Sequence, residues 1–255
     1  KFCAGETDIS DASRAIKDEE KAACEQAGVT YTELRIANDA ITVLTNASND
    51  SVQCLTFDDL YGLVGPESEG VKTWSEATAK GATSKLPDAP LEIFAPGTES
   101  GTYDSFYELA IKDIADERGI PEDAQIRPDY GGLANDNEII SGLQSVDSSF
   151  GWVGFAFAEE ATGVREIEVD GGEGCVAPSA ETVADGTYPL ARPLFIYVNN
   201  EKLADNAALS DFVDFYLSDE GMAAVPEVGY VPLTDADLEA TRTTWTQAKA
   251  GAPKS

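Results

Sequence analysis

The residues best suited to bind an anion lie in the hydroxyl-rich run Phe-Ala-Pro-Gly-Thr-Glu-Ser-Gly-Thr at positions 94–102. A strand-like segment ends there in a turn, and a helical pattern begins at Gly101. Ser100, Gly101 and Thr102 therefore fall where the first backbone N–H groups of a helix point outward, beside two hydroxyl donors. This arrangement predicts an oxyanion site, with the alternative that Ser100 only caps its own helix. A Walker A nucleotide site is excluded, because no G-x-x-x-x-G-K-[ST] sequence occurs.

Two further segments carry candidate ligands. In the run 7–14, Thr-Asp-Ile-Ser-Asp-Ala-Ser-Arg, Ser13 and Arg14 precede a predicted helix, and a guanidinium offers a planar fork of donors that matches a tetrahedral oxyanion. The alternative for Arg14 is a surface ion pair. Asp136 lies in Leu-Ala-Asn-Asp-Asn-Glu, positions 133–138, where it could instead be a helix cap.

The residue types in the chain give little support for a catalytic function. The chain has no histidine, which removes Ser-His-Asp and Cys-His catalysis and His-ligated zinc. The Asp-rich stretch at 235–237 does not fit an EF-hand, because Ala240 and Thr246 stand where Gly and Glu are needed. We expect no catalytic residues, no metal and no cofactor.

The charge balance limits the partners. The 255 residues include 17 Lys and Arg and 47 Asp and Glu, which give a net charge of −30. This charge disfavours binding to nucleic acid and to anionic lipid. The hydrophobic fraction of 42% suffices for a core. No run of 18 apolar residues occurs, and Lys1, Phe2 and Cys3 show no leader pattern, so an exported protein would have lost its signal peptide.

The four cysteines permit three disulfide pairings. We favour Cys3 with Cys24 and Cys54 with Cys175, which implies an oxidising, extracytoplasmic compartment. The alternative is four reduced, buried cysteines.

The elements that must position these residues alternate along the chain, which predicts an α/β protein. The patterns indicate helices over 17–26, 55–64, 101–118, 137–146, 207–217 and 234–248. Strands are predicted over 31–36, 40–44, 91–94, 150–156, 165–169 and 192–198, with a bend at Asn38-Asp39. In the helix over 207–217, Phe212, Val213, Phe215 and Tyr216 lie on or near one face.

Seven motifs in this order resemble the phosphate-binding proteins of bacterial phosphate ABC transporters, the PstS family, and in particular its SphX-like branch. The residues that carry the likeness are 2–14 (FCAGETDISDASR), 96–102 (PGTESGT), 135–137 (NDN), 150–157 (FGWVGFAF), 174–179 (GCVAPS), 192–198 (RPLFIYV) and 228–233 (VGYVPL). Together they extend over essentially the whole chain.

The resemblance implies a two-lobed, type II periplasmic-binding-protein fold with a ligand cleft between lobes and hinge strands. Lobe I would contain residues 1–37 and 197–255, and lobe II residues 38–196. Ser100, Gly101 and Thr102 match the family's phosphate ligands. Pro96 stands where many relatives have arginine, so Arg14, with Ser13, is the expected replacement. Asp136 or Asp11 would accept the phosphate proton, which sulfate lacks.

The resemblance also carries a departure. Family members begin with a strand, a hydroxyl-bearing loop and a Gly-rich helix start, and about 50 residues of that pattern do not precede the first motif here. We therefore expect an incomplete chain, in which lobe I lacks part of its phosphate donors.

The function implied is a monomeric receptor for inorganic phosphate that delivers its ligand to a membrane-embedded ABC permease. Alternatives are another tetrahedral oxyanion (arsenate, sulfate or molybdate), an extracytoplasmic phosphatase, or an adhesion or scaffold role.

Overall fold

The computed structural model describes residues 1–251, and the chain divides into two compact units. Unit 1 is Lys1–Asp39 together with the described residues from Arg192 onward, and unit 2 is Ala40–Ala191. No helix in residues 1–251 has the length and apolar character needed to cross a membrane. The lobe limits given above, 1–37 with 197–255 and 38–196, stay a prediction.

Unit 1 is built on three neighbouring strands in the order β1-β9-β2. β1 runs antiparallel to β9, with Ile9 opposite Val198 and Ala12 opposite Phe195. The elements of this part of the chain are β1 (Ile9–Ala12), α1 (Asp18–Gln26), β2 (Tyr31–Asn46), β9 (Ala191–Asn199), α8 (Asn200–Asp205), α9 (Ala207–Tyr216), α10 (Asp219–Glu227) and α11 (Asp235–Gly251).

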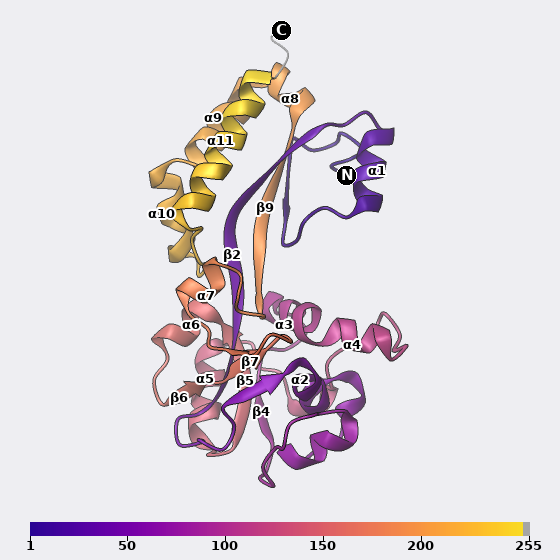
Figure 1. Cartoon of the computed structure of the whole chain (residues 1–255), viewed down its shortest axis with the longest axis vertical. Coiled ribbons are helices and arrows are strands. Elements are labelled where there is room, and N and C mark those ends of the chain that lie inside the picture. Colours follow the sequence, from indigo (N-terminus) through magenta and orange to yellow (C-terminus); the bar gives the residue numbers. More distant parts are fainter. Residues whose placement is uncertain (252–255) are drawn as a thin grey trace. The chain divides into compact units, whose positions relative to one another are not determined.

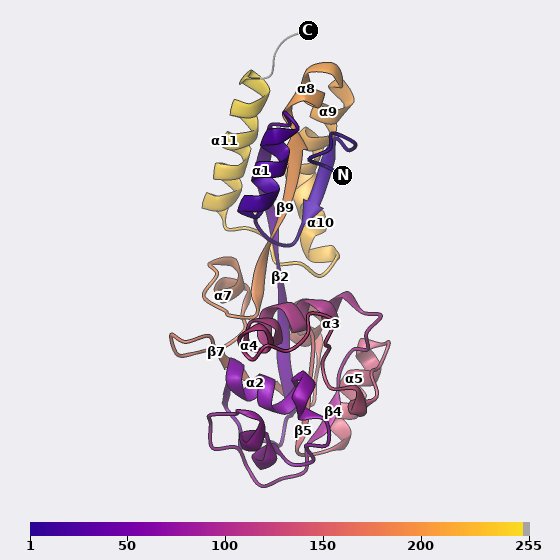
Figure 2. The ribbon, with the colours of Figure 1, turned by 90° about the vertical axis from the view of Figure 1, so that its right-hand side faces the viewer.

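The sheet of unit 1 is covered on both faces, with α9, α10 and α11 on one and α1 on the other (Figures 1 and 2). β9 contributes side chains to the core on both faces, because successive side chains of a strand point to opposite sides. Ile196 and Val198 pack with the C-terminal helices, around Trp245. Phe195 and Tyr197 pack on the other side, with Cys24 of α1. The near-continuous apolar run at 192–198 is the pattern expected of a strand buried on both faces.

The bend predicted at Asn38-Asp39 is wrong, because β2 is a single strand of 16 residues. The N–H of Asn38 donates to the carbonyl of Val231, and the N–H of Val231 donates back to that of Asn38, each at 2.8 Å. This pair of bonds satisfies the backbone in the middle of the strand, so the polar residues do not interrupt it.

Unit 2 contains a curled sheet in which β5 lies between β2 and β4, with β6 also on β2, and a second sheet ordered β3-β7-β8. Its strands are β3 (Cys54–Thr56), β4 (Glu92–Phe94), β5 (Ser149–Gly154), β6 (Val164–Glu166), β7 (Glu168–Asp170) and β8 (Cys175–Val176). Its α-helices are α2 (Phe57–Val64), α3 (Gly101–Phe106), α4 (Lys112–Glu117), α5 (Asp136–Ser145), α6 (Phe155–Glu160) and α7 (Ala180–Ala184). Shorter 3₁₀ turns are η1 (Pro66–Ser68), η2 (Trp74–Lys80) and η4 (Pro128–Tyr130), and η3 (Tyr107–Ile111) is a π-helical stretch.

The core of unit 2 forms around β5. Val153 packs with Leu143 of α5 and with Leu44 of β2. Trp152, its neighbour on the strand, stacks on Phe106 of α3 with the ring centroids 4.1 Å apart. Both aromatic rings are fully buried, so the helix that starts at Gly101 is fixed to the sheet by its own second turn.

Several predicted elements differ in detail. The helix over 101–118 is interrupted by η3, and the strand over 165–169 is two strands, because β6 pairs with β2 whereas β7 pairs with β3. The strand over 150–156 ends at Gly154, and α6 begins at the next residue, Phe155. In α9, Val213 is buried but Phe212 and Phe215 are half exposed, so the four aromatic and apolar residues do not form one buried face.

Candidate functional site

The helix start in unit 2 is shaped by Ser100. Its hydroxyl oxygen accepts a hydrogen bond from the N–H of Thr102 at 3.1 Å, so Ser100 is the N-cap of α3. A Cβ added at Gly101 would meet nothing within 4 Å, which leaves the backbone open to solvent there. A serine hydroxyl has one donor besides its acceptor sites, so capping does not use up its capacity to donate to an anion.

The turn before this helix is held in place by close packing against a second loop. The N–H of Gly97 donates to the carbonyl of Leu133, and the N–H of Leu133 donates to the carbonyl of Ala95. The Tyr130 hydroxyl donates to the carbonyl of Pro96 at 2.7 Å. A Cβ at Gly132 would lie 2.4 Å from the Cα of Gly97, so glycine is required for this approach. The loop that leads to Asp136 is thereby fixed beside the loop that leads to Ser100.

Asp136 is the first residue of α5, and its side chain is half buried. The cap of that helix is Asn135, whose side chain accepts from the N–H of Asn137 at 2.8 Å. Within residues 1–251, the carboxylate of Asp136 has neither a hydrogen bond nor an ion pair. Burial raises the pKa of this carboxyl above its ordinary value. The alternative that Asp136 is the cap is therefore wrong, and an unpartnered acceptor lies at this helix start.

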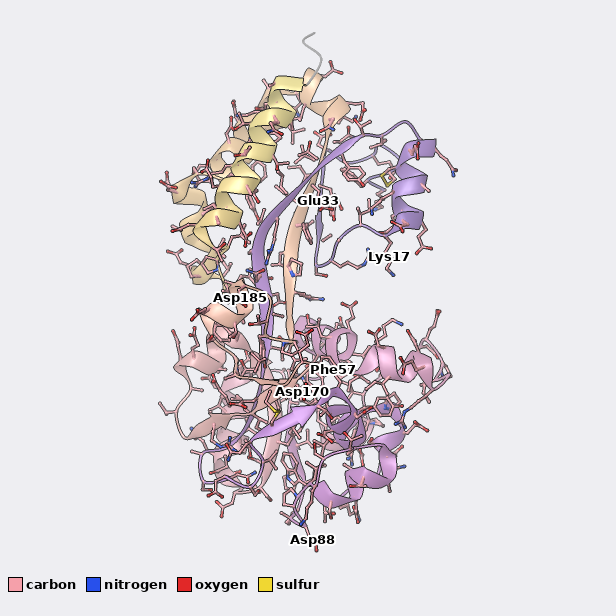
Figure 3. The ribbon with its side chains drawn as sticks, viewed as in Figure 1. Lys17, Glu33, Phe57, Asp88, Asp170 and Asp185 are labelled. Carbon is pink, nitrogen blue, oxygen red and sulfur yellow. A yellow bond between two sulfur atoms is a disulfide. The ribbon has the colours of Figure 1, made fainter. Side chains whose placement is uncertain are left out.

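In unit 1, Ser13 and Arg14 follow β1 directly. Arg14 donates two hydrogen bonds to Glu20, from Nη1 to Oε2 and from Nη2 to Oε1, each at 2.8 Å. Glu20 also accepts from the N–H of Lys17, which Figure 3 labels at the amino end of α1. The pKa of Glu20 is lowered to about 2, mainly by the hydrogen bond from Arg14.

Ser13 and Arg14 line a hollow of about 820 Å³ that lies entirely within unit 1. Hydroxyls of Thr7 and Ser10 line it as well, together with Tyr197. Asp11, the other predicted proton acceptor, is exposed on β1 and lines the same hollow. The structure therefore places two cationic residues, Lys1 and Arg14, and several hydroxyls around one space, together with the carboxylates of Asp11 and Glu20. The cations and hydroxyls are donors of the kind that an oxyanion needs.

Each unit contains one disulfide. Cys3 is bonded to Cys24 in unit 1, and Cys54 is bonded to Cys175 in unit 2, which is the pairing favoured from the sequence. In residues 1–251, one group of side chains has metal-ligand spacing: Cys54, Cys175 and Glu168 have their sulfur and carboxylate oxygen atoms within 4.8 Å of one another. While the sulfurs are bonded to each other, they offer no thiolate.

Comparison with known proteins gives the family. A family model described as a PBP superfamily domain matches residues 1–220. Protein SphX of Synechocystis is 38% identical over 253 residues, which cover 98% of this chain and 71% of SphX. The chain belongs to the SphX and PstS family. The α/β fold of the two-lobed, type II periplasmic-binding-protein class, predicted from the sequence, is thereby confirmed.

Other family members extend this relationship. The phosphate-binding protein PstS of Staphylococcus epidermidis is 37% identical over 233 residues, which cover 91% of this chain and 65% of that protein. The crystal structure of a possible phosphate-binding protein from Planctomyces limnophilus superposes with a TM-score of 0.84 at 32% identity, over 97% of this chain and 83% of that chain. The chain thus spans about two thirds of the length of these curated relatives.

Glu20 was not predicted as part of the site. It is the third residue of α1, and a glutamate three positions after the N-cap, here Lys17, commonly turns back toward the N–H of that cap. This local signal predicts its bond to the N–H of Lys17, but the ion pair with Arg14 depends on how α1 packs beside the end of β1.

Proposed function

We propose that this chain is an extracytoplasmic binding protein that captures inorganic phosphate and delivers it to a membrane-embedded ABC permease. Its membership in the SphX and PstS family supports the proposal. The observation that carries it is the helix start in unit 2, where Ser100, Gly101 and Thr102 combine two hydroxyls with an open backbone.

Phosphate would be bound by short-range donors. A chain with a net charge of −30 repels anions at long range, so attraction must come from groups that touch the ligand. The N–H groups of the first turn of α3 point along the helix axis, and the helix dipole adds a partial positive charge there. The hydroxyls of Ser100 and Thr102 supply further donors to the phosphate oxygens.

Unit 1 would contribute the cation. Arg14 has the planar fork that binds two oxygens of a tetrahedral anion, and Ser13 lies next to it on the same hollow. Pro96 of unit 2 cannot supply the charge that many relatives have at the matching position. We therefore assign the charge-neutralising role to Arg14.

Selectivity for phosphate over sulfate would come from a carboxylate that accepts the proton of monohydrogen phosphate. Asp136 is the better candidate, because its carboxylate is half buried and unpartnered within the described residues. Asp11 is the alternative. A sulfate dianion offers no proton, so it would face the same carboxylate as a repelled charge.

Several further properties follow from the proposal. The ligand is released unchanged, without a catalytic step, a metal or a cofactor, and the working form is a monomer. The protein reaches its compartment by means of a signal peptide that is later removed, and the two disulfides suit an oxidising environment.

Equilibrium dialysis with radiolabelled phosphate tests this function. The proposal expects one saturable site per chain, competed by unlabelled phosphate and far more weakly by sulfate. Light scattering on the same sample should give the mass of one chain, 27.0 kDa. Retention of label that cannot be saturated, or equal competition by sulfate, would count against phosphate as the ligand.

A further inference from the structure

The second sheet of unit 2 gathers side chains that the phosphate site does not use. β3 runs parallel to β7 with Cys54 opposite Glu168, and β8 runs antiparallel to β7 with Cys175 opposite Asp170. Because Glu168 and Asp170 are two positions apart on one strand, their side chains share a face of this sheet. The register therefore places both cysteines and both carboxylates on the same face.

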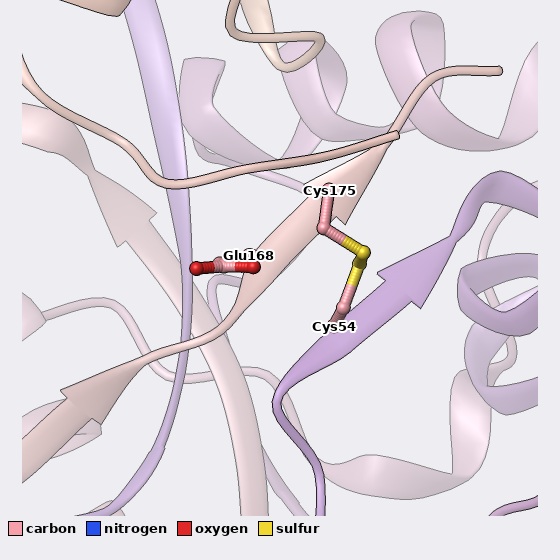
Figure 4. Close-up of side chains that lie close together, drawn as sticks. All are labelled: Cys54, Glu168 and Cys175. Carbon is pink, nitrogen blue, oxygen red and sulfur yellow. A yellow bond between two sulfur atoms is a disulfide. The ribbon is translucent and has the colours of Figure 1, made fainter. Parts of the chain in front are cut away.

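Glu168 is the unusual member of this group. Figure 4 shows it on the strand beside the disulfide. Its side chain is half buried, and its carboxylate makes no hydrogen bond or ion pair with any other residue among 1–251. Asp170 is committed elsewhere, because its Oδ1 accepts from the N–H groups of Gly172 and Gly174 at 2.7 and 2.9 Å. Asp170 lies beside the start of α2, near Phe57 (Figure 3).

We propose that reduction of the Cys54–Cys175 disulfide creates a zinc site in unit 2, with the two thiolates and the Glu168 carboxylate as protein ligands and water in the fourth position. The three ligand atoms already lie within 4.8 Å of one another. Two Zn–S bonds of about 2.3 Å at a tetrahedral angle need sulfurs about 3.8 Å apart. The exposed side chain of Cys175 can rotate to that spacing without disturbing a core.

The chemistry balances with a dithiol as reductant. Its thiolate attacks one sulfur of the disulfide, and its second thiol resolves the mixed disulfide, so the reductant leaves as a cyclic disulfide and both cysteines become thiols. Zn²⁺ then displaces the two thiol protons to solvent as the two Zn–S bonds form. Exposure of Cys175 gives both the dithiol and the metal a path to the sulfurs.

The ligand set selects the metal. Thiolates favour Zn²⁺ over the hard cations Ca²⁺ and Mg²⁺, which prefer oxygen ligands. Three protein ligands and one water match a four-coordinate zinc site with an open position. The bound metal would keep β3, β7 and β8 together after the covalent link is lost, so the reduced protein would be stabilised by zinc and the oxidised protein would not.

Co²⁺ is the probe for the test, because thiolate ligation gives it a charge-transfer band in the near ultraviolet. The intact protein is reduced with dithiothreitol, freed of it by gel filtration under nitrogen, and titrated with Co²⁺ and then Zn²⁺. We expect one Co²⁺ per chain, displaced by Zn²⁺, and no band in the oxidised protein. Glu168→Gln should weaken binding about tenfold or more, since even the loss of a residue behind the ligands costs that much.

The other disulfide is the matched control. Around Cys3 and Cys24, no third ligand has this spacing within the described chain. The band should survive Cys3→Ser with Cys24→Ser and disappear in Cys54→Ser with Cys175→Ser. The proposal would be overturned if the band disappeared on replacement of Cys3 and Cys24. It would also be overturned if Glu168→Gln bound Co²⁺ as tightly as the wild-type protein, or if the reduced wild-type protein gave no band. If the reduced protein loses its circular dichroism signal, the readout is the recovery of that signal on addition of metal. The same variants are then compared.

Discussion

The guanidinium of Arg14 and the carboxylate of Glu20 meet edge to edge, through two hydrogen bonds of 2.8 Å each. Half of the Arg14 side chain and 41% of the Glu20 side chain are exposed, so this pair contributes less than about 1 kcal/mol to stability. The pair matters for the position of the carboxylate relative to the guanidinium donors. The carboxylate occupies the fork of donors that a phosphate would use, so phosphate must displace Glu20 to bind Arg14 in the proposed way.

Replacing Arg14 tests the assigned cation. Arg14→Ala removes charge-assisted hydrogen bonds worth about 1.5–3 kcal/mol, so phosphate affinity should fall about 10- to 100-fold in titration calorimetry. Lys21→Ala is the matched control, because Lys21 lies in the same unit, is 52% exposed and also has one carboxylate partner, Asp18. If the two variants lose affinity equally, Arg14 has no special role.

Ser100 is expected to matter for the ligand more than for the fold. Ser100→Ala removes an N-cap, at a cost of about 1 kcal/mol. It also removes the hydroxyl that we propose as a donor to phosphate. Ser179 caps α7 in the same unit by accepting from the N–H of Thr182, so Ser179→Ala should cost similar stability. Only Ser100→Ala should lower phosphate affinity, by about tenfold. Unchanged affinity in Ser100→Ala would show that its hydroxyl only caps the helix.

The proposed role of Asp136 predicts a pH dependence of phosphate binding. A carboxyl that accepts the ligand's proton can do so only while it is ionised, and burial raises the pKa of Asp136. Affinity should therefore fall on acidification at a higher pH than for an ordinary aspartate, whose pKa is about 3.9. Asp136→Asn should remove this dependence and narrow the preference for phosphate over sulfate. Asp235→Asn, at the first position of α11, is the control and should change neither.

Two threonines on β2 should respond oppositely to the same substitution. The buried hydroxyl of Thr42 has no hydrogen-bond partner within the described residues, so Thr42→Val should stabilise the protein by about 1 kcal/mol. The hydroxyl of Thr45 donates to the carbonyl of Ser149 and accepts from Asn49, so Thr45→Val should destabilise by about 1–3 kcal/mol. Urea unfolding measures both changes, and a loss of stability in Thr42→Val contradicts the first.

The sequence predicted those features that local pattern controls. The apolar run at 192–198 predicted β9, and the pattern over 55–64 predicted the helix that is α2. The turn that ends at Gly101 was expected to begin a helix, and it does. These signals depend on neighbours within a few positions, through side-chain periodicity and capping.

Features set by packing between distant segments could not be predicted in this way. The continuity of β2 depends on Val231, which is far along the chain and bonds to Asn38. The exposure of Phe212 depends on which face of α9 the sheet covers, and the helical period does not contain that information. The contact between Cys54 and Glu168 likewise follows from a parallel register between two short strands.

The central claim is that this chain binds phosphate selectively, and calorimetric titration of the intact protein with phosphate, arsenate and sulfate tests it most directly. The account predicts saturable heat at one site per chain for phosphate. The affinity for arsenate, which also carries a proton, should be closer to that for phosphate than the affinity for sulfate is. No heat with any of the three anions at micromolar protein, or sulfate binding as tightly as phosphate, would contradict it.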